Sequence, residues 1–231
     1  MKSFVPRNSL LIIMVLLITT SCSRRHYSSS LFDQQTAGHK LIAVLPAEMV
    51  FTGNRPKNLT TEDIARIEEE ESKAFQVALY NSILRHANTR RYEMVVNVQD
   101  FSSTQRLLEK DSISIRDAWH RDDAELCKIL GVDAVVRMRV QKKRYMSDMT
   151  SYGIDVARRI GNDIGVLGKV PIPGNVNKTN DIYATCSLVS KGQTLWNNNY
   201  KGASNWNRQA NEIIESITDN FGRNFPYKQR R

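Results

Sequence analysis

The stretch Val132–Met146, VDAVVRMRVQKKRYM, has the clearest strand pattern in the chain. Apart from Asp133 it opens with apolar residues, and it then alternates apolar and polar residues through Val136, Met138 and Val140. A continuous apolar run is typical of a strand that is buried on both faces, whereas alternation is typical of a strand with one exposed face. We therefore expect a strand that is central in a sheet at its start and half-exposed further along.

Two strands and a helix are expected after this strand. The segments Asp181–Val189 and Gln193–Tyr200 flank Ser190-Lys191-Gly192, which is typical of a hairpin turn. The segment Ser204–Asn224 then places its apolar residues at helical spacing and predicts an amphipathic helix.

Strands and helices also precede the central strand. A long helix is expected at about 61–88, with hydroxyl residues at its start and an apolar face that includes Phe75, Leu79 and Ile83. The acidic run Glu68–Glu71 is expected on the solvated flank of that helix. The other expected elements are a buried strand at His39–Pro46, a loop at Ala47–Leu59, a strand at Tyr92–Val98, and helices at about 100–108 and 115–130.

This order of elements predicts an α/β fold, with a mixed sheet flanked by helices in a single domain over 39–231. The chain has no repeated unit of about 30 residues and no glycine fingerprint of a doubly wound fold. An insertion at about 147–180 interrupts the domain, and it fits either an amphipathic helix, a flexible hairpin or a loosely ordered linker. Tyr152, Arg158 and Arg159 in this insertion are the candidate partner-binding residues, because aromatic and guanidinium groups suit protein surfaces.

The N-terminal 21 residues have the layout of an export signal. Met1–Asn8 carries Lys2 and Arg7, and Leu10–Ile18 is a run of nine apolar residues. A membrane-spanning helix needs about 20 apolar residues, roughly twice this number. Residues 1–21 are therefore predicted to be a signal peptide.

Cys22 follows small residues and resembles the acylated cysteine of bacterial lipoproteins, with Thr19 where leucine is usual. The resemblance implies a palmitate-bearing Cys22 as the first mature residue. Ser23 in place of aspartate implies an outer-membrane lipid anchor that faces the periplasm. The polar stretch 22–38 is expected to be a tether. An ordinary secretory signal with an incidental cysteine, or an uncleaved anchor, is the alternative.

Composition limits the possible partners and cofactors. Without residues 1–21 the chain keeps 31 Lys and Arg against 24 Asp and Glu, a net charge of +7. The basic residues lie in short clusters without a reading motif, and export makes nucleic acid the least expected partner. Cys127 and Cys186 are expected to be free thiols, and no Cys/His spacing indicates a metal site or another cofactor.

Catalytic patterns are weak throughout the sequence. His120 stands near Asp122 and Asp123, but a solvated helix face explains this cluster better than an acid–base site, and no hydrolase motif accompanies it. Trp196 and Trp206 could stack on a sugar, yet core anchors are the better interpretation. The chain is therefore not expected to be an enzyme.

Three stretches together resemble the periplasmic lipoprotein domains of the TolB amino-terminal type, which include the curli secretion channel lipoprotein. They are Lys40–Pro46, Leu130–Val136 and Gly192–Trp196. The resemblance implies a non-enzymatic binding or assembly accessory for an envelope complex, which contacts a protein partner or the cell wall. A ring-forming subunit of a curli-type channel is the alternative, so an oligomer is possible, and an exported envelope hydrolase is less favoured. A pore is doubtful because Ile154–Leu167 lacks the alternation of a lipid-facing strand.

Overall fold

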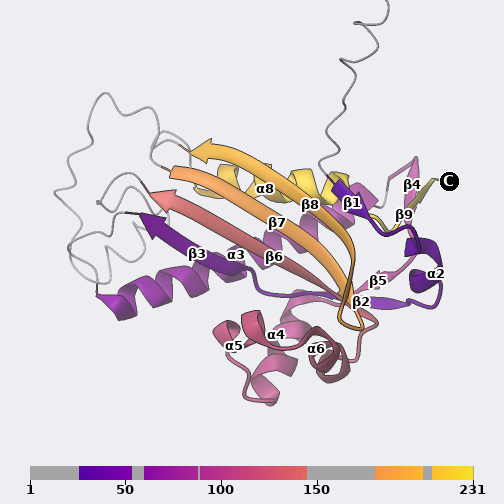
Figure 1. The fold of residues 1–231 in the computed structure, drawn as a ribbon, viewed down its shortest axis with the longest axis horizontal. Helices are drawn as coiled ribbons and strands as arrows, with labels where there is room; N and C mark the ends of the chain where they lie inside the picture. The colour runs from indigo at the N-terminus through magenta and orange to yellow at the C-terminus, as the bar shows by residue number, and fades with distance from the viewer. Residues whose placement is uncertain (1–25, 54–59, 88, 145–179, 205–209, 231) are drawn as a thin grey trace, which may run out of the picture.

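A seven-stranded mixed sheet forms the centre of the computed structural model, which describes residues 26–53, 60–87, 89–144, 180–204 and 210–230 (Figure 1). The α/β prediction is confirmed. The sheet has the order β1-β8-β7-β6-β2-β5, and β3 also pairs with β6. Its strands are β1 (His26–Ser28), β2 (Leu41–Val44), β3 (Glu48–Gly53), β5 (Asn97–Val98), β6 (Ala134–Arg144), β7 (Asn180–Ser190) and β8 (Gln193–Ser204).

Helices cover both faces of the sheet, but not equally. The helices α3 (Thr61–Ala87) and α8 (Ala210–Arg223) lie behind the long strands in Figure 1, whereas a second group lies below, near β2. This second group consists of α4 (Phe101–Lys110), α5 (Ile115–His120) and α6 (Asp123–Leu130). The remaining elements are the short helix α2 (Phe32–Thr36) and a separate antiparallel ribbon of β4 (Tyr92–Met94) and β9 (Lys228–Arg230).

β6 is the central strand that its sequence predicts. One edge pairs antiparallel with β7 along its length, and the other edge pairs in parallel with β2 and then with β3. Ala134, Val135 and Val136 are fully buried, because helices cover both faces there. Beyond Met138 only alternate residues are buried, which confirms the expected half-exposed end.

The chain leaves β2 and returns to the sheet as β3 within a stretch that was expected to be a loop. Pro46 lies between these strands and has no backbone N–H for a ladder. The side-chain amide of Gln76 in α3 donates to the carbonyl oxygen of Val44 at 2.8 Å. The last carbonyl group of β2 therefore has a hydrogen-bond partner. The prediction of a loop over Ala47–Leu59 was wrong for Glu48–Gly53, because this segment, with its apolar run Met49–Phe51, pairs in parallel with β6.

The long helix α3 packs its apolar face against the sheet, as predicted. Phe75, Leu79 and Ile83 are fully buried against the strands and α8. The two helices come closest at Gly222 of α8, where a Cβ atom would lie 2.3 Å from the Oγ of Ser82. Only glycine allows this approach without a shift of one helix.

Glu71 corrects the prediction that the acidic run Glu68–Glu71 is solvated, because it is buried in an ion pair with Lys142 of β6. The two residues are 1% and 7% exposed, and the Lys142 Nζ lies 2.6 Å from the Glu71 Oε2. The Lys142 ammonium also lies over the rings of Phe51 and Phe75, at 5.4 and 5.8 Å from the ring centroids. The partner charge and the two rings explain how a lysine can lie on the core face.

Two expected elements are each divided in the structure. The helix expected at 115–130 consists of α5 and α6, because Asp122 accepts from two backbone N–H groups and starts a new helix. Gly131 ends α6 in a left-handed conformation, which glycine adopts without strain. The strand expected at Tyr92–Val98 is divided between β4 and β5, which belong to different sheets.

The stretch expected to be a tether contains two folded elements. β1 pairs antiparallel with β8, and the ring of Phe32 in α2 lies 5.6 Å from the ring of Tyr227. The described fold therefore begins at His26 rather than after residue 38. A strand of only three residues, His-Tyr-Ser, is too short to show the apolar pattern that reveals strands in a sequence, so its pairing with β8 could not be predicted.

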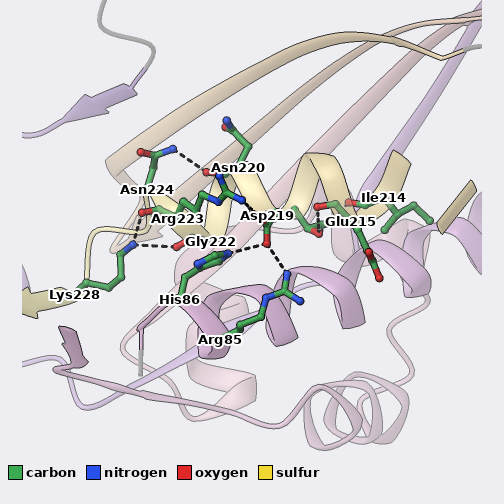
Figure 2. A network of polar contacts seen from close by, with 11 residues as sticks. Arg85, His86, Ile214, Glu215, Asp219, Asn220, Gly222, Arg223, Asn224 and Lys228 are labelled. Carbon is green, nitrogen blue, oxygen red and sulfur yellow. Dashed lines mark hydrogen bonds and ion pairs between the residues drawn. The ribbon is translucent and has the colours of Figure 1, made fainter. Parts of the chain in front are cut away.

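Asp219 of α8 holds the two outer helices together near their C-terminal ends (Figure 2). Its carboxylate accepts hydrogen bonds from Arg85 and His86 of α3, at 2.5 and 2.7 Å, and pairs with Arg223 at 2.7 Å. Burial alone would raise the pKa of Asp219, but the hydrogen bonds from His86 and Arg85 outweigh it and lower this pKa to about 2.

The lowered pKa of Asp219 predicts how stability responds to acid. An unfolded aspartate titrates near 3.8, so this carboxylate stabilises the fold above about pH 4, and the stabilisation is lost as pH falls towards 2. Asp219→Asn should therefore lose less stability between pH 4 and pH 2 than the wild type, in urea unfolding curves. In the control Asp111→Asn, at an exposed position, the free energy of unfolding should fall between pH 4 and pH 2 as it does in the wild type. If Asp219→Asn and the wild type lost the same free energy of unfolding between pH 4 and pH 2, the stabilising role of the ionised Asp219 would be refuted.

The two cysteines in the described ranges are free, as expected. Burial raises the pKa of both thiols, to about 11 for Cys127 and further for the fully buried Cys186. Thiols with raised pKa values are poor nucleophiles at neutral pH. Among the described helices, none combines the length and apolar character that a membrane crossing requires.

Candidate functional site

The residues that the sequence singles out for function lie outside the described residues. These are the lipidation candidate Cys22 and the partner-binding candidates Tyr152, Arg158 and Arg159 of the insertion at 147–180. The candidate site below is therefore built from other residues, on the part of the sheet that the described helices leave uncovered.

We call the outer side of β3, β6, β7 and β8 the open face. These strands are long and twisted, and α3 and α8 cover only their rear side in Figure 1. The helices α4, α5 and α6 contact the opposite side of the sheet near β2 and the starts of β6 and β7. The side chains that alternate with the core residues therefore point outwards, and they include Arg139, Gln141, Tyr183, Thr185, Asn199 and Lys201.

Polar contacts between neighbouring strands order the open face. Thr185 donates to the side-chain oxygen of Asn199 at 2.9 Å, and Asn199 donates to Asn197 at 3.1 Å. Asn197 in turn donates to the hydroxyl of Ser187 at 2.9 Å. This chain of hydrogen bonds holds the amide and hydroxyl groups in defined positions, so the surface is preorganised.

Charged and aromatic groups flank this polar row. Arg139 of β6 contacts both carboxylate oxygens of Glu48 in β3, at 2.9 and 3.1 Å. Tyr183 is 40% exposed, and the Lys201 Nζ lies 5.4 Å from its ring centroid. An exposed tyrosine beside a cation and fixed amides is typical of surfaces that bind proteins, because it offers apolar area at low entropic cost.

A pocket of about 330 Å³ lies where the open face meets α5 and α6. Glu48, Trp119, Arg139 and Thr185 are among its lining residues. The Nε1 of Trp119 has no hydrogen-bond partner among the described residues, and the Arg116 guanidinium lies 5.4 Å from the indole ring. The pocket therefore has an aromatic wall, while the Trp119 Nε1 itself is buried beneath the surface.

Arg137 also lines this pocket but serves the fold. It pairs with Asp123 and donates to the carbonyl oxygens of Ala118 and Trp119, both at 3.0 Å. These carbonyls belong to the C-terminal turn of α5, which would otherwise lack partners. The Arg137 guanidinium thus joins α5 and α6 to β6. Arg139 is the more available of the two arginines for contact with a partner.

The His120 cluster is dispersed in the structure. Asp122 caps α6 and Asp123 pairs with Arg137, so neither carboxylate orients the exposed imidazole. No group of three or more potential metal ligands occurs within the described ranges. Trp196 is buried and packs edge-on against Phe225, with the ring centroids 5.8 Å apart, which confirms its role as a core anchor. Trp206 lies outside the described residues.

The outward-facing residues of the open face can be recognised in the sequence, but the sequence does not show that they form a site. Alternation in β6 predicts that Arg139 and Gln141 point outwards, and the run Asn197-Asn198-Asn199 is unusual for a strand. Outward polar residues are ordinary in half-buried strands, however. Only the strand register shows that these residues from three strands adjoin.

No protein-family model and no curated protein matches the chain. Solved structures with a similar overall architecture include the PelC dodecamer from Paraburkholderia phytofirmans, at 10% identity and TM-score 0.40 over 86% of this chain and 93% of that chain. Lipoprotein GNA1162 from Neisseria meningitidis aligns at 12% identity and TM-score 0.43, over 78% of this chain and 94% of that chain. The LpoB C-terminal domain from Salmonella enterica aligns at 13% identity and TM-score 0.34, over 75% and 92%. At this level the likeness is one of architecture only.

Proposed function

We propose that this protein is an outer-membrane lipoprotein, anchored through Cys22 and facing the periplasm, which acts as a non-enzymatic binding or assembly accessory. Its partner is another protein of the cell envelope. The observation that carries the proposal is the open face, a preorganised polar surface with an exposed tyrosine and no described helix across it.

The N-terminal sequence supports the anchoring. A basic start, nine apolar residues and small residues before Cys22 match an export signal with an acylated cysteine. The sequence resemblance to TolB-type lipoprotein domains supports the same location and a role without catalysis.

The chemistry of the open face supports protein binding rather than hydrolysis. Its polar groups are hydroxyls, amides, the Arg139–Glu48 pair and cations such as Lys201, and its ordered amides pair readily with a polypeptide surface. The Trp119 wall of the pocket supplies a place for one apolar anchor of the partner.

A second copy of the chain is the other partner that the fold accommodates. The outer edge of β3 pairs with no strand among the described residues, and such an edge can accept a strand from another molecule. This edge supports the alternative of a ring-forming subunit. The mass of the purified protein in solution separates a lone module from a ring.

A crosslinking pull-down from intact envelopes tests the open face. Tyr183→Glu/Lys201→Glu should reduce recovery of the partner at least tenfold, because it removes the exposed ring and reverses a charge beside the polar row. The control Lys110→Glu changes an exposed lysine on α4 and should leave recovery unchanged. Thermal unfolding of both variants checks that the fold is retained.

The insertion at 147–180, with Tyr152, Arg158 and Arg159, is the rival contact site. Replacing residues 150–178 by a short Gly/Ser loop tests it in the same pull-down. Loss of the partner in this variant alone, with full recovery by Tyr183→Glu/Lys201→Glu, would contradict the open face as the binding site.

A further inference from the structure

Exposed apolar side chains gather at one end of the molecule. The described residues include five large apolar side chains with high exposure, and four of them lie near β1 and the β4–β9 ribbon. These four are 39% to 56% exposed, and they are Tyr27, Leu31, Tyr92 and Val95. An apolar group of this kind on a soluble domain indicates a contact with a protein or a membrane.

Tyr227 joins the elements that carry these side chains. Its ring lies 5.6 Å from the ring of Phe32, which follows Leu31, and its carbonyl oxygen accepts from the backbone N–H of Val95 at 3.1 Å. The next residue, Lys228, lies over the ring of Tyr92 at 5.6 Å from its centroid. The exposed residues of α2, β4 and β9 therefore belong to one continuous surface, which includes a pocket of about 420 Å³.

Basic residues border the same apolar group. Arg90 and Arg91 are exposed in the turn between α3 and β4, and Arg223 is exposed at the end of α8. Lys228 donates to the carbonyl oxygens of Gly222 and Arg223 and so joins β9 to α8 (Figure 2). The nearby acids are Asp33, Glu93 and Asp219, against Arg90, Arg91, Arg223 and Lys228, and Asp219 is already paired with arginines. The excess charge of this end is thus positive.

The chain enters the fold at this same end. Only Ser23, Arg24 and Arg25 separate Cys22 from the start of β1, so the two Cα atoms at positions 22 and 26 lie at most ~14 Å apart. His26 pairs with Asn198, whose side chain donates to Asn220 of α8 at 3.4 Å. Figure 1 shows β1, the end of α8 and the β4–β9 ribbon together at the upper right. A lipid on Cys22 would hold this end close to the membrane.

We propose that this end is a membrane-contact surface that binds anionic phospholipid headgroups of the leaflet in which the lipid on Cys22 is anchored. We call it the anchor-side surface and define it by Leu31, Arg90, Arg91, Tyr92, Val95 and Arg223. The proposal rests on the proposed acylation of Cys22. Tyrosines and aliphatic side chains suit the interface between headgroups and acyl chains, while arginines bind the phosphates. The contact fixes the orientation of the domain, so that the open face is presented sideways to the periplasm.

Photo-crosslinking to lipid tests this surface on the full, acylated protein in vesicles. The vesicles contain phosphatidylethanolamine, phosphatidylglycerol and a trace of a diazirine-bearing phospholipid, and crosslinked peptides are identified by mass spectrometry. Peptides from residues 89–96 and 226–229 should carry at least tenfold more lipid than those from α4–α6, which lie elsewhere on the fold. Equal labelling of both sets would overturn the proposal.

Charge reversal tests the headgroup contact. Arg90→Glu/Arg91→Glu should lower labelling of residues 89–96 at least tenfold, since each basic residue near an anionic surface contributes roughly fivefold. Lys110→Glu on α4 is the matched control and should label as the wild type does. Unchanged labelling in the double variant, with an unchanged thermal transition, would refute the role of the arginines.

The same samples test the acylation of Cys22 independently of the anchor-side surface. The mass of the N-terminal peptide reports whether Cys22 is acylated. An unmodified Cys22 would refute the anchor, and with it the membrane orientation proposed for this surface. An acylated Cys22 with no preference for residues 89–96 would refute the anchor-side surface and leave the anchor intact.

Discussion

Glu71→Ala is expected to lower the free energy of unfolding by about 3–5 kcal/mol, because it leaves the ammonium of Lys142 buried without its carboxylate. Lys142 is 7% exposed and lies between the rings of Phe51 and Phe75, so water reaches it poorly. The rings attract the cation but do not replace a paired charge. Urea unfolding, followed by circular dichroism, measures the loss.

Two further variants isolate the buried charge as the cause. Glu70→Ala, one residue away, removes an exposed pair with Lys73 at 3.5 Å and should cost about 0.5 kcal/mol or less. Glu71→Leu/Lys142→Met removes both charges and should recover most of the stability, because apolar replacement of a buried pair is often neutral. If Glu71→Ala cost no more than Glu70→Ala, the pair would not be buried in solution.

This pair illustrates what the sequence could and could not predict about the fold. The period of apolar residues predicted α3, β6, the β7–β8 hairpin and α8, because long elements bury whole faces. Glu71 and Lys142 break the apolar pattern of their faces, and each looks solvated when its own segment is considered alone. Their burial depends on pairing across elements 71 residues apart, which local patterns do not record.

The short elements were missed for a related physical reason. The sequences of β1 and β9, HYS and KQR, are weakly apolar, and pairing with β8 and β4 overrides their propensity. β3 does contain the apolar run Met49–Phe51, and its place in the sheet comes from parallel pairing with β6.

The candidate sites differ in how far the sequence could predict them. Cys22 is predicted from its local context alone, because the export machinery reads linear sequence. The open face and the anchor-side surface each combine residues from several elements. Tyr183 and Lys201, for example, lie 18 positions apart and are joined only by the β7–β8 register. Such sites become visible only with the structure.

Cys22→Ala is expected to abolish fatty-acid labelling of the protein and to release it from the membrane fraction, in a soluble or unprocessed form. The thioether to the lipid forms on the Cys22 sulfur, so alanine leaves no attachment point. Cys127→Ser is the matched control, because Cys127 is packed against the domain core and should not affect labelling. Density-gradient fractionation should place the wild-type protein in the outer membrane.

The partner-binding role and the membrane-contact surface both depend on this anchor. Mass spectrometry of the N-terminal peptide of the protein, purified from its own membranes, tests the anchor most directly. We predict a peptide that begins at Cys22 and carries the mass of a diacylglyceryl group and an amide-linked fatty acid. A peptide that begins upstream of Cys22, or an unmodified Cys22, would contradict the account.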